Sequence, residues 1–155
     1  MKGLLMASTL TLISVLACAA QTPPPQDKDQ ITEVTLERTA CFGTCPIYKV
    51  TLRSDGTITY EGREFVQMKG THKGMVYGFD RLARLILAQG YFNLKDDYSI
   101  PATDLPSAIT SVVRAGKRKT IADYGGAGPI ELWGIEMAID GMLKNAKLTI
   151  VPPGK

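Results

Sequence analysis

Apolar residues recur every second position in some segments of the chain and every third or fourth position in others. The first spacing predicts strands and the second predicts helices. Between Ile31 and Arg38 the period is two, with Val34 and Leu36 on one face and polar side chains on the other. Tyr48 to Glu61 repeats this alternation on either side of an Asp-Gly pair at 55–56, which favours the positive φ of a hairpin turn. A period of two is typical of half-buried strands, so we expect one strand and one hairpin here.

Later segments predict a further strand, a second hairpin and two helices. The strand falls within Glu64–Val76, where Gly70 and Gly74 weaken it. The hairpin comprises Ser107–Val113 and Arg118–Tyr124, with its turn at 115–116, and the helices comprise Asp80–Gln89 and a segment whose first residue is Pro129. In both helical segments apolar residues recur at helical spacing. The grouping indicates an α+β fold: an antiparallel β-sheet built from hairpins, with two helices packed on one face.

The composition is that of an ordinary globular protein and gives no sign of a polyanion-binding class. The chain of 155 residues has 18 basic and 15 acidic side chains and a net charge of +3. This balance leaves no broad basic surface for nucleic acid, so no nucleic-acid partner is expected. The length suits one domain, which we place at residues 31–150.

The first residues are typical of an export leader. Lys2 supplies a positive charge and an apolar run extends from Leu4 to Leu16, shorter than the roughly 20 residues that a lasting membrane span needs. Residues 15–18, at the end of the leader pattern, read Val-Leu-Ala-Cys and resemble the lipobox of bacterial lipoproteins. The sequence therefore predicts a lipoprotein-type signal peptide over residues 1–17 and lipidation of Cys18, whereas plain secretory cleavage nearby stays an alternative.

Residues 18–30 are predicted to be a tether between the lipid anchor and the domain. Pro23, Pro24 and Pro25 favour an extended polyproline II path. Ala19 stands after the cysteine, where aspartate would resemble an inner-membrane retention signal, so the periplasmic side of the outer membrane is expected in a host with two membranes. The expected partners are the membrane, reached through Cys18, and an envelope protein or glycan.

Two further cysteines, Cys41 and Cys45, are expected to form a structural disulfide in the oxidising compartment beyond the membrane. The bridge requires Cα atoms within about 7 Å, so the chain must turn at Gly43. A thiol redox centre and a metal site with His72 are the alternatives. Redox sites of the thioredoxin type have a shorter spacing at a helix start, and haem attachment needs a histidine where Pro46 stands.

Five polar residues are candidates for ligand contact, although each has a simpler structural explanation. Asp104 precedes Leu-Pro, where aspartate commonly caps a turn. Arg114, Lys117 and Arg118 flank the second hairpin turn and offer positive charge, but such tips are usually only solvated. Tyr124 precedes a glycine cluster whose amides could hold an anion, without the lysine of a phosphate-binding loop. We predict no catalytic residue, no metal site and no cofactor, and the protein is expected not to be an enzyme.

One combination of motifs resembles a known family. The motifs are Arg38-x-x-Cys41-Phe42-Gly43-x-Cys45-Pro46-x-Tyr48, Asp55-Gly56, Tyr60-Glu61-Gly62 and Thr103-Asp104-Leu105-Pro106. Together they look like a family of bacterial secreted and lipoprotein domains of unknown function. The resemblance covers Ile31 to Asn145 and implies a shared fold and an extracytoplasmic setting, with no activity, substrate or catalytic residue.

The function expected from these observations is that of a membrane-anchored module of the cell envelope that binds or supports another component. The alternative is an envelope protein that uses Cys41 and Cys45 for thiol redox chemistry or metal binding. A deep polar pocket formed by Asp104, His72 and Tyr124 would weigh against the first function.

Overall fold

The computed structural model describes residues 30–152, so the predicted leader, Cys18 and nearly all of the predicted tether lie outside the described residues. In chain order the elements are β1 (Ile31–Arg38), β2 (Tyr48–Arg53), β3 (Thr57–Gly62), β4 (Gly70–Met75), α1 (Phe79–Ala88), the short 3-10 helix η1 (Tyr91–Asn93), β5 (Asp97–Tyr98), β6 (Ser107–Arg114), β7 (Lys117–Tyr124), α2 (Ile130–Lys144) and β8 (Lys147–Ile150).

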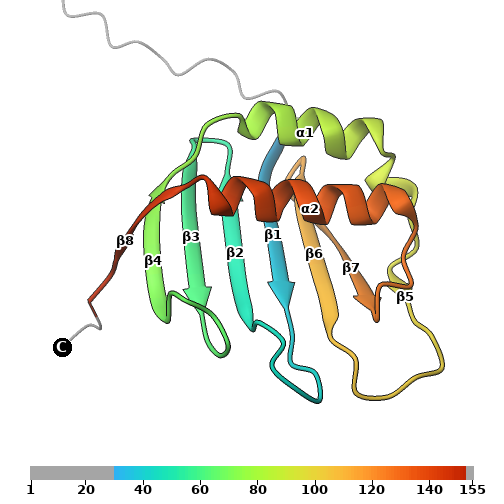
Figure 1. Cartoon of the computed structure of the whole chain (residues 1–155). Helices are drawn as coiled ribbons and strands as arrows, with labels where there is room; N and C mark the ends of the chain where they lie inside the picture. The colour runs from blue at the N-terminus through green and yellow to red at the C-terminus, as the bar shows by residue number, and fades with distance from the viewer. Residues whose placement is uncertain (1–29, 153–155) are drawn as a thin grey trace, which may run out of the picture.

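Within the described residues, eight strands form one sheet in the order β5-β7-β6-β1-β2-β3-β4-β8. Neighbouring strands are antiparallel except for β5 and β7, which pair in parallel. In the view of Figure 1, α1 and α2 run across the front of this sheet. The domain is therefore α+β with a mostly antiparallel sheet, as the sequence predicts.

The core forms where apolar side chains of the strands pack against apolar side chains of the helices. In β1 the alternating Val34 and Leu36 are both fully buried. On the helices the buried residues recur every three or four positions, including Ile86 of α1 and Ile135 and Ile139 of α2. These strand and helix residues belong to one hydrophobic cluster. Each fully buried side chain of this kind contributes about 1.5–3 kcal/mol to folding.

Both predicted hairpins form, and their turns have the backbone geometry that tight turns need. Gly56 has a φ of 82°, and at the second turn Ala115 and Gly116 have φ values of 52° and 71°.

The second helix begins one residue later than predicted: Pro129 has an extended backbone and caps the helix, and Ile130 is the first helical residue. Proline suits this place because it has no N–H to leave unpaired.

The predicted strand within Glu64–Val76 is confirmed only in its second half, β4, and residues 63–69 form a loop instead. The two glycines that weakened the prediction lie inside the strand. Gly74 is needed there because a Cβ atom would collide with the carbonyl oxygen of Lys147. This close approach is the pairing of β4 with β8, a strand that the sequence does not predict.

Candidate functional site

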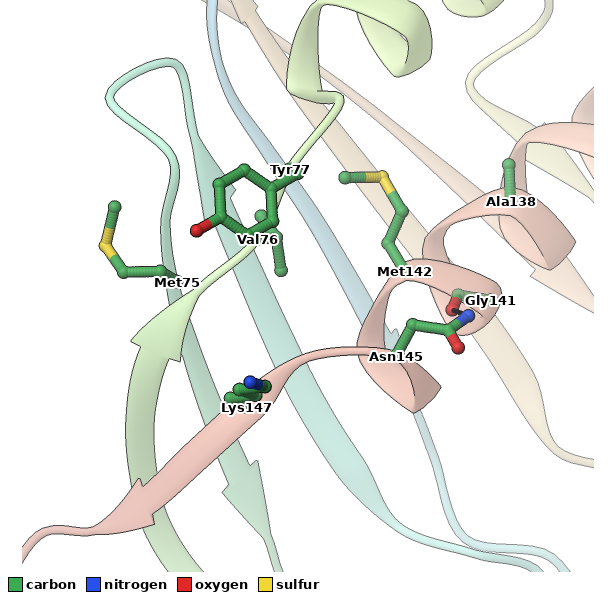
Figure 2. A pocket seen from close by; sticks show the side chains of 8 residues that line it. All are labelled: Met75, Val76, Tyr77, Ala138, Gly141, Met142, Asn145 and Lys147. Carbon is green, nitrogen blue, oxygen red and sulfur yellow. Dashed lines mark hydrogen bonds between the residues drawn. The ribbon is translucent and has the colours of Figure 1, made fainter.

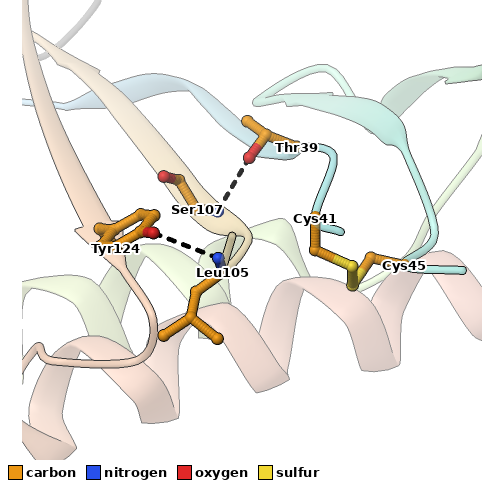
Figure 3. Close-up of a disulfide and its surroundings, with 6 residues drawn as sticks. All are labelled: Thr39, Cys41, Cys45, Leu105, Ser107 and Tyr124. Atoms are coloured by element: carbon orange, nitrogen blue, oxygen red, sulfur yellow. Dashed lines mark hydrogen bonds between the residues drawn. A yellow bond between two sulfur atoms is a disulfide. The ribbon is translucent and has the colours of Figure 1, made fainter. Parts of the chain in front are cut away.

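A disulfide-bonded corner connects β1 to β2 (Figure 3). Cys41 and Cys45 are joined by a disulfide, with their Cα atoms 5.7 Å apart, and the chain turns between them, where the Gly43 N–H donates to the Cys41 carbonyl at 2.9 Å. Cys45 is followed by Pro46 and then by a strand, not by a helix start. The predicted disulfide is therefore present, and its surroundings lack the helix dipole that activates redox cysteines.

Hydrogen bonds dock this corner on the loop before β6. The Thr39 N–H donates to the Ser107 carbonyl at 3.0 Å, and the Phe42 N–H donates to the Asp104 carbonyl at 3.0 Å. In return, the Ser107 N–H donates to Thr39 Oγ1 at 2.8 Å. The Cys-Phe-Gly and Asp-Leu-Pro motifs thus lie against each other, although about 60 residues separate them in the sequence.

The corner brings Arg38 and Tyr48 together, because these residues are paired in register where β1 ends and β2 begins. Both side chains reach Asp140 of α2. The Arg38 guanidinium donates to Asp140 Oδ2 from Nε at 3.2 Å and from Nη2 at 2.7 Å. The Tyr48 hydroxyl donates to Asp140 Oδ1 at 2.5 Å and accepts from Arg38 Nε at 3.2 Å. All three side chains hold one another in place.

Burial and charge shift the pKa values within this cluster. Burial lowers the pKa of Arg38, but the hydrogen bond and the charge of Asp140 outweigh this effect, so the net shift is upward. Burial raises the pKa of Tyr48, and the hydrogen bond and charge of Asp140 raise it further, against the opposing effect of Arg38. Arg38 therefore stays cationic and Tyr48 stays neutral at physiological pH.

Glu136, one helical turn before Asp140, is a buried carboxyl group without a full set of partners. It is 3% exposed, and its Oε1 meets no hydrogen-bond donor among the described residues. Its Oε2 lies 3.6 Å from Arg38 Nη2, beyond hydrogen-bonding distance. Burial raises the pKa of Glu136 to about 7; Arg38 opposes this shift, and the charges of Asp123 and Asp140 add to it. The group is thus poised between its acid and its anion near neutral pH.

A pocket of about 380 Å³ lies beside this carboxyl group, and we call it the Glu136 pocket. Its polar lining includes Arg38, Asp123 and Glu136, and its walls include the following residues: Cys45, Pro46, Pro106, Ala108, Trp133 and Met137. Asp123 is 4% exposed, and its Oδ1 accepts the Gly128 N–H at 2.8 Å. Two buried carboxyl groups and one guanidinium therefore lie among apolar side chains.

The five predicted ligand-contact residues do not form one site. Asp104 and Tyr124 lie near the disulfide corner, where the Tyr124 hydroxyl accepts the Leu105 N–H at 3.1 Å (Figure 3). Arg114, Lys117 and Arg118 lie at the opposite end of the β6–β7 hairpin, roughly 20 Å away along the strands.

The basic group at the hairpin turn has its own structural contacts. The Arg114 guanidinium lies 5.2 Å from the Phe92 ring centroid, and Arg118 Nη2 forms a 2.6 Å ion pair with Glu33 Oε1. Part of the positive charge at this hairpin turn therefore already interacts with groups of the domain itself.

His72, the histidine of the alternative metal site, lies on β4. Its Nε2 is 3.1 Å from the Lys69 carbonyl oxygen, and its ring centroid is 6.0 Å from that of Tyr60. Between residues 30 and 152 no three His, Cys, Asp or Glu side chains gather into a group that could hold a metal ion. No helix in this same range is both long and apolar enough to cross a membrane.

A second hollow, of about 490 Å³, lies between the end of β4 and the last turns of α2 (Figure 2). Met75, Val76 and Tyr77 line one side, and Ala138 and Met142 line the other. This hollow is mainly apolar. Among the described residues, the buried side-chain oxygen without a partner belongs to Glu136, so the Glu136 pocket is the stronger candidate for specific recognition.

Sequence reasoning missed the carboxyl groups of this site, although a signal for each was present. Glu136 follows Leu132 by four positions and precedes Ile139 by three, which puts a charged residue on the apolar stripe of the helix. Asp123 follows the buried Ile121 by two positions and therefore points to the same face of its strand. A charged side chain at a position that the pattern assigns to the core is rare, and it therefore indicates a candidate site.

Removing the disulfide tests whether it is a local stabiliser. Replacing Cys41 and Cys45 together by serine is expected to lower the free energy of unfolding by about 2 kcal/mol, because a loop this short loses little chain entropy on closure. Urea unfolding of the purified chain measures the change.

The wild-type chain under reducing conditions is the matched control and should lose the same amount. A loss below about 0.5 kcal/mol would mean that the hydrogen bonds of the corner suffice without the bridge. A chain that no longer folds would mean that the bridge holds more than this corner.

Comparison with known proteins identifies the family but no activity. The family described as "Domain of unknown function (DUF6438)" matches residues 32–143, a range that contains the disulfide corner, Asp123 and Glu136. No curated protein matches the chain. The resemblance noted in the sequence is thereby confirmed at the level of the family, and the chain belongs to the DUF6438 family of domains of unknown function.

Proposed function

We propose that the protein is a membrane-anchored module of the cell envelope that binds a ligand or partner in the Glu136 pocket without catalysing a reaction. One observation carries this proposal: a buried carboxyl oxygen of Glu136 meets no donor among the described residues, and Glu136 is one of the residues around a pocket that Arg38, Cys45 and Pro46 also line. Leaving a buried acceptor unpaired costs about 1–3 kcal/mol. A bound group that donates to it would remove this cost.

The bonding of the neighbouring polar groups favours binding over catalysis. Arg38, Tyr48 and Asp140 are hydrogen-bonded to one another, so they form a rigid support for the pocket. The sulfur of Cys45, which lines the pocket, is bonded to Cys41 and offers no thiolate for nucleophilic or redox chemistry. A rigid framework around one free acceptor is suited to recognition.

The envelope setting is supported by the sequence and agrees with the disulfide. The supporting features resemble those of a lipoprotein: the leader pattern of residues 1–17, the lipobox-like segment ending at Cys18 and the proline-rich segment after it. A disulfide persists in oxidising compartments. In a host with two membranes, the proposed place is the periplasmic side of the outer membrane, where the tether would hold the pocket up to about 30 Å from the lipid.

We further infer that α1 and α2 cover one face of the sheet only. Their buried residues share a core with alternate strand residues, and the intervening positions carry ion pairs such as Arg53–Glu33 and Arg63–Glu37. Charges that are already paired with each other favour a solvated face. This is a further reason to assign recognition to the Glu136 pocket.

Thiol redox exchange by Cys41 and Cys45 has weaker support, because a strand and not a helix start follows the second cysteine. A reduction potential below about −300 mV is characteristic of a structural bridge, and a value well above it would favour exchange.

Photo-crosslinking in the host tests the proposed function. A photoreactive amino acid in place of Met137, a residue of the pocket wall, is expected to give a discrete adduct in the membrane fraction, because this side chain lies beside the proposed binding site. Mass spectrometry identifies the adduct.

The same chain with Cys18→Ala is expected to leave the membrane fraction, because lipid anchors hold proteins through buried methylene groups.

Arg84 supplies the matched control, since it is an exposed position on the other helix, α1. Probes at the two positions that label the same set of proteins and glycans would contradict binding at the pocket. An unmodified mature N-terminus at Ala20 or Gln21 would contradict lipidation of Cys18.

A further inference from the structure

The charge balance around the Glu136 pocket is negative. One cation, Arg38, lies among three carboxyl groups, those of Asp123, Glu136 and Asp140. Its guanidinium makes two hydrogen bonds to Asp140, which largely neutralises both charges. The carboxyl groups of Glu136 and Asp123 are the other acidic groups of the pocket lining, and a carboxylate attracts a cation strongly in a partly desolvated site.

The hydrogen-bonding inventory of these two carboxyl groups shows what kind of ligand they accept. Glu136 Oε1 has no donor among the described residues, and Asp123 binds the Gly128 N–H through Oδ1. An ionised carboxyl group can only accept hydrogen bonds. A ligand that supplies several N–H donors on a positive charge therefore suits the pair better than a neutral or anionic one.

The walls of the pocket add a second requirement. Pro46, Ala108, Trp133 and Met137 present apolar surface, which favours a hydrocarbon stem next to the charged group. The face of an indole ring also attracts a cation. A volume of about 380 Å³ accommodates a group of side-chain size at the lower end of the usual range for ligand pockets.

We propose that the Glu136 pocket binds a primary ammonium group on an apolar stem, with Glu136 and Asp123 accepting its hydrogen bonds and Trp133 lining its path. The inference rests on the proposed binding function and specifies its ligand class. Such a group is present in free alkylamines and in lysine side chains, and the experiment separates these two sources.

The chain carries its own probe, because Trp133 is its single tryptophan and lines the pocket. Purified full-length protein is titrated with pentylamine, with 1-pentanol as the neutral analogue of similar shape, and with Nα-acetyl-lysine amide. Tryptophan fluorescence is followed. Pentylamine is expected to bind at least about tenfold more tightly than pentanol, because charge-assisted hydrogen bonds are the stronger kind.

Binding of both amines would point to a lysine side chain of a partner as the natural ligand. Binding of pentylamine alone would point to a small free amine. Equal affinities for pentylamine and pentanol would overturn the inference, and so would the lack of any saturable fluorescence change.

Variants assign the binding to the carboxyl groups. Glu136→Gln and Asp123→Asn are each expected to weaken pentylamine binding at least about tenfold. Asp104→Asn, which removes a carboxyl group of the nearby loop at an exposed position, is expected to leave it unchanged. Glu136→Gln binding as tightly as the wild type would overturn the inference.

The pH dependence provides a readout that a purely structural role would not give. The groups facing Glu136 are Arg38 of β1, Asp123 of β7, Asp140 of α2 and Tyr91 of η1. With a Glu136 pKa of about 7, protons compete with the ammonium group below this pH. The affinity is expected to fall about 30-fold between pH 8 and pH 5.5, and to change little in Glu136→Gln.

The crosslinking experiment at Met137 keeps the two proposals separate. A specific adduct at Met137 without any amine preference in the titrations would leave the binding function standing and reject the ammonium ligand. Absence of the adduct together with absence of amine binding would reject both.

Discussion

Asp140→Ala is expected to lower the free energy of unfolding by about 3 kcal/mol, the largest loss we anticipate for a single charged residue of this domain. The substitution leaves the Arg38 guanidinium and the Tyr48 hydroxyl without the acceptor that now takes bonds of 2.7 Å and 2.5 Å from them. Removing one partner of a buried ion pair costs about 3–5 kcal/mol. The lower end applies because the Arg38 and Asp140 side chains are 22% and 26% exposed.

Asp80→Ala is the matched control for this prediction. Asp80 also lies on a helix and pairs with an arginine, Arg84, at 2.9 Å, but both side chains are mostly exposed. Its loss should cost much less than that of Asp140, because water screens an exposed ion pair. Urea unfolding of both variants measures the difference. If Asp140→Ala costs no more than Asp80→Ala, the bonds between β1, β2 and α2 do not stabilise the domain in the way proposed.

Glu136→Gln is expected to stabilise the domain at pH 8 and to leave its stability nearly unchanged at pH 4. In the folded chain the pKa of Glu136 is about 7, above its ordinary value of 4.5. Between these pH values the unfolded state has released the proton that the folded state still holds, so wild-type stability falls as the pH rises. Well above pH 7 the wild type has lost all of the stability that the bound proton provides. Glutamine does not titrate, so the variant escapes a loss of about 3 kcal/mol at pH 8.

Unfolding in urea at pH 4 and at pH 8, on wild type and variant, tests this sign, because other titrating groups cancel in the difference. Glu64→Gln serves as the control for the chemical change itself, because Glu64 is exposed and paired with the exposed Lys69. A Glu136→Gln variant that is less stable than the wild type at pH 8 would show that Arg38 holds the ionised carboxylate in a net favourable contact.

Much of the fold could be predicted from local sequence because strands and helices need only a short periodic pattern. The alternation around Val34 and Leu36 specified β1, and the Asp-Gly pair at 55–56 specified the turn of the first hairpin. Where glycines broke the pattern, within Glu64–Val76, the prediction is confirmed only in part, because β4 forms but residues 63–69 do not belong to it. Gly74 weakened β4 in the sequence, yet it is required there by the approach of β8, a contact between segments about 70 residues apart.

The candidate site was predictable only in part. The motif from Arg38 to Tyr48 stood out in the sequence, and its disulfide was inferred from the spacing of the cysteines and the expected compartment. The contacts of this motif could not be predicted, because the side chains at its two ends, Arg38 and Tyr48, form hydrogen bonds to Asp140, which lies 102 residues beyond Arg38. The predicted contact residues came from loops and turns: an aspartate before Leu-Pro, a tyrosine before a glycine cluster and the basic residues of a hairpin tip. The carboxyl groups among the pocket residues, Asp123 and Glu136, are instead buried.

The sequence by itself determined the α+β class, the positions of most strands and helices, the cysteine corner and the expectation of a tethered envelope domain, because each depends on residues close together in the chain. Only the tertiary structure decided which polar groups meet. Strand pairing brings Arg38 beside Tyr48, and packing of α2 on the sheet sets Glu136 next to Asp123 in a desolvated pocket. The physical reason is that burial and charge proximity, which determine a pKa and a binding preference, are properties of the folded arrangement and not of any one segment.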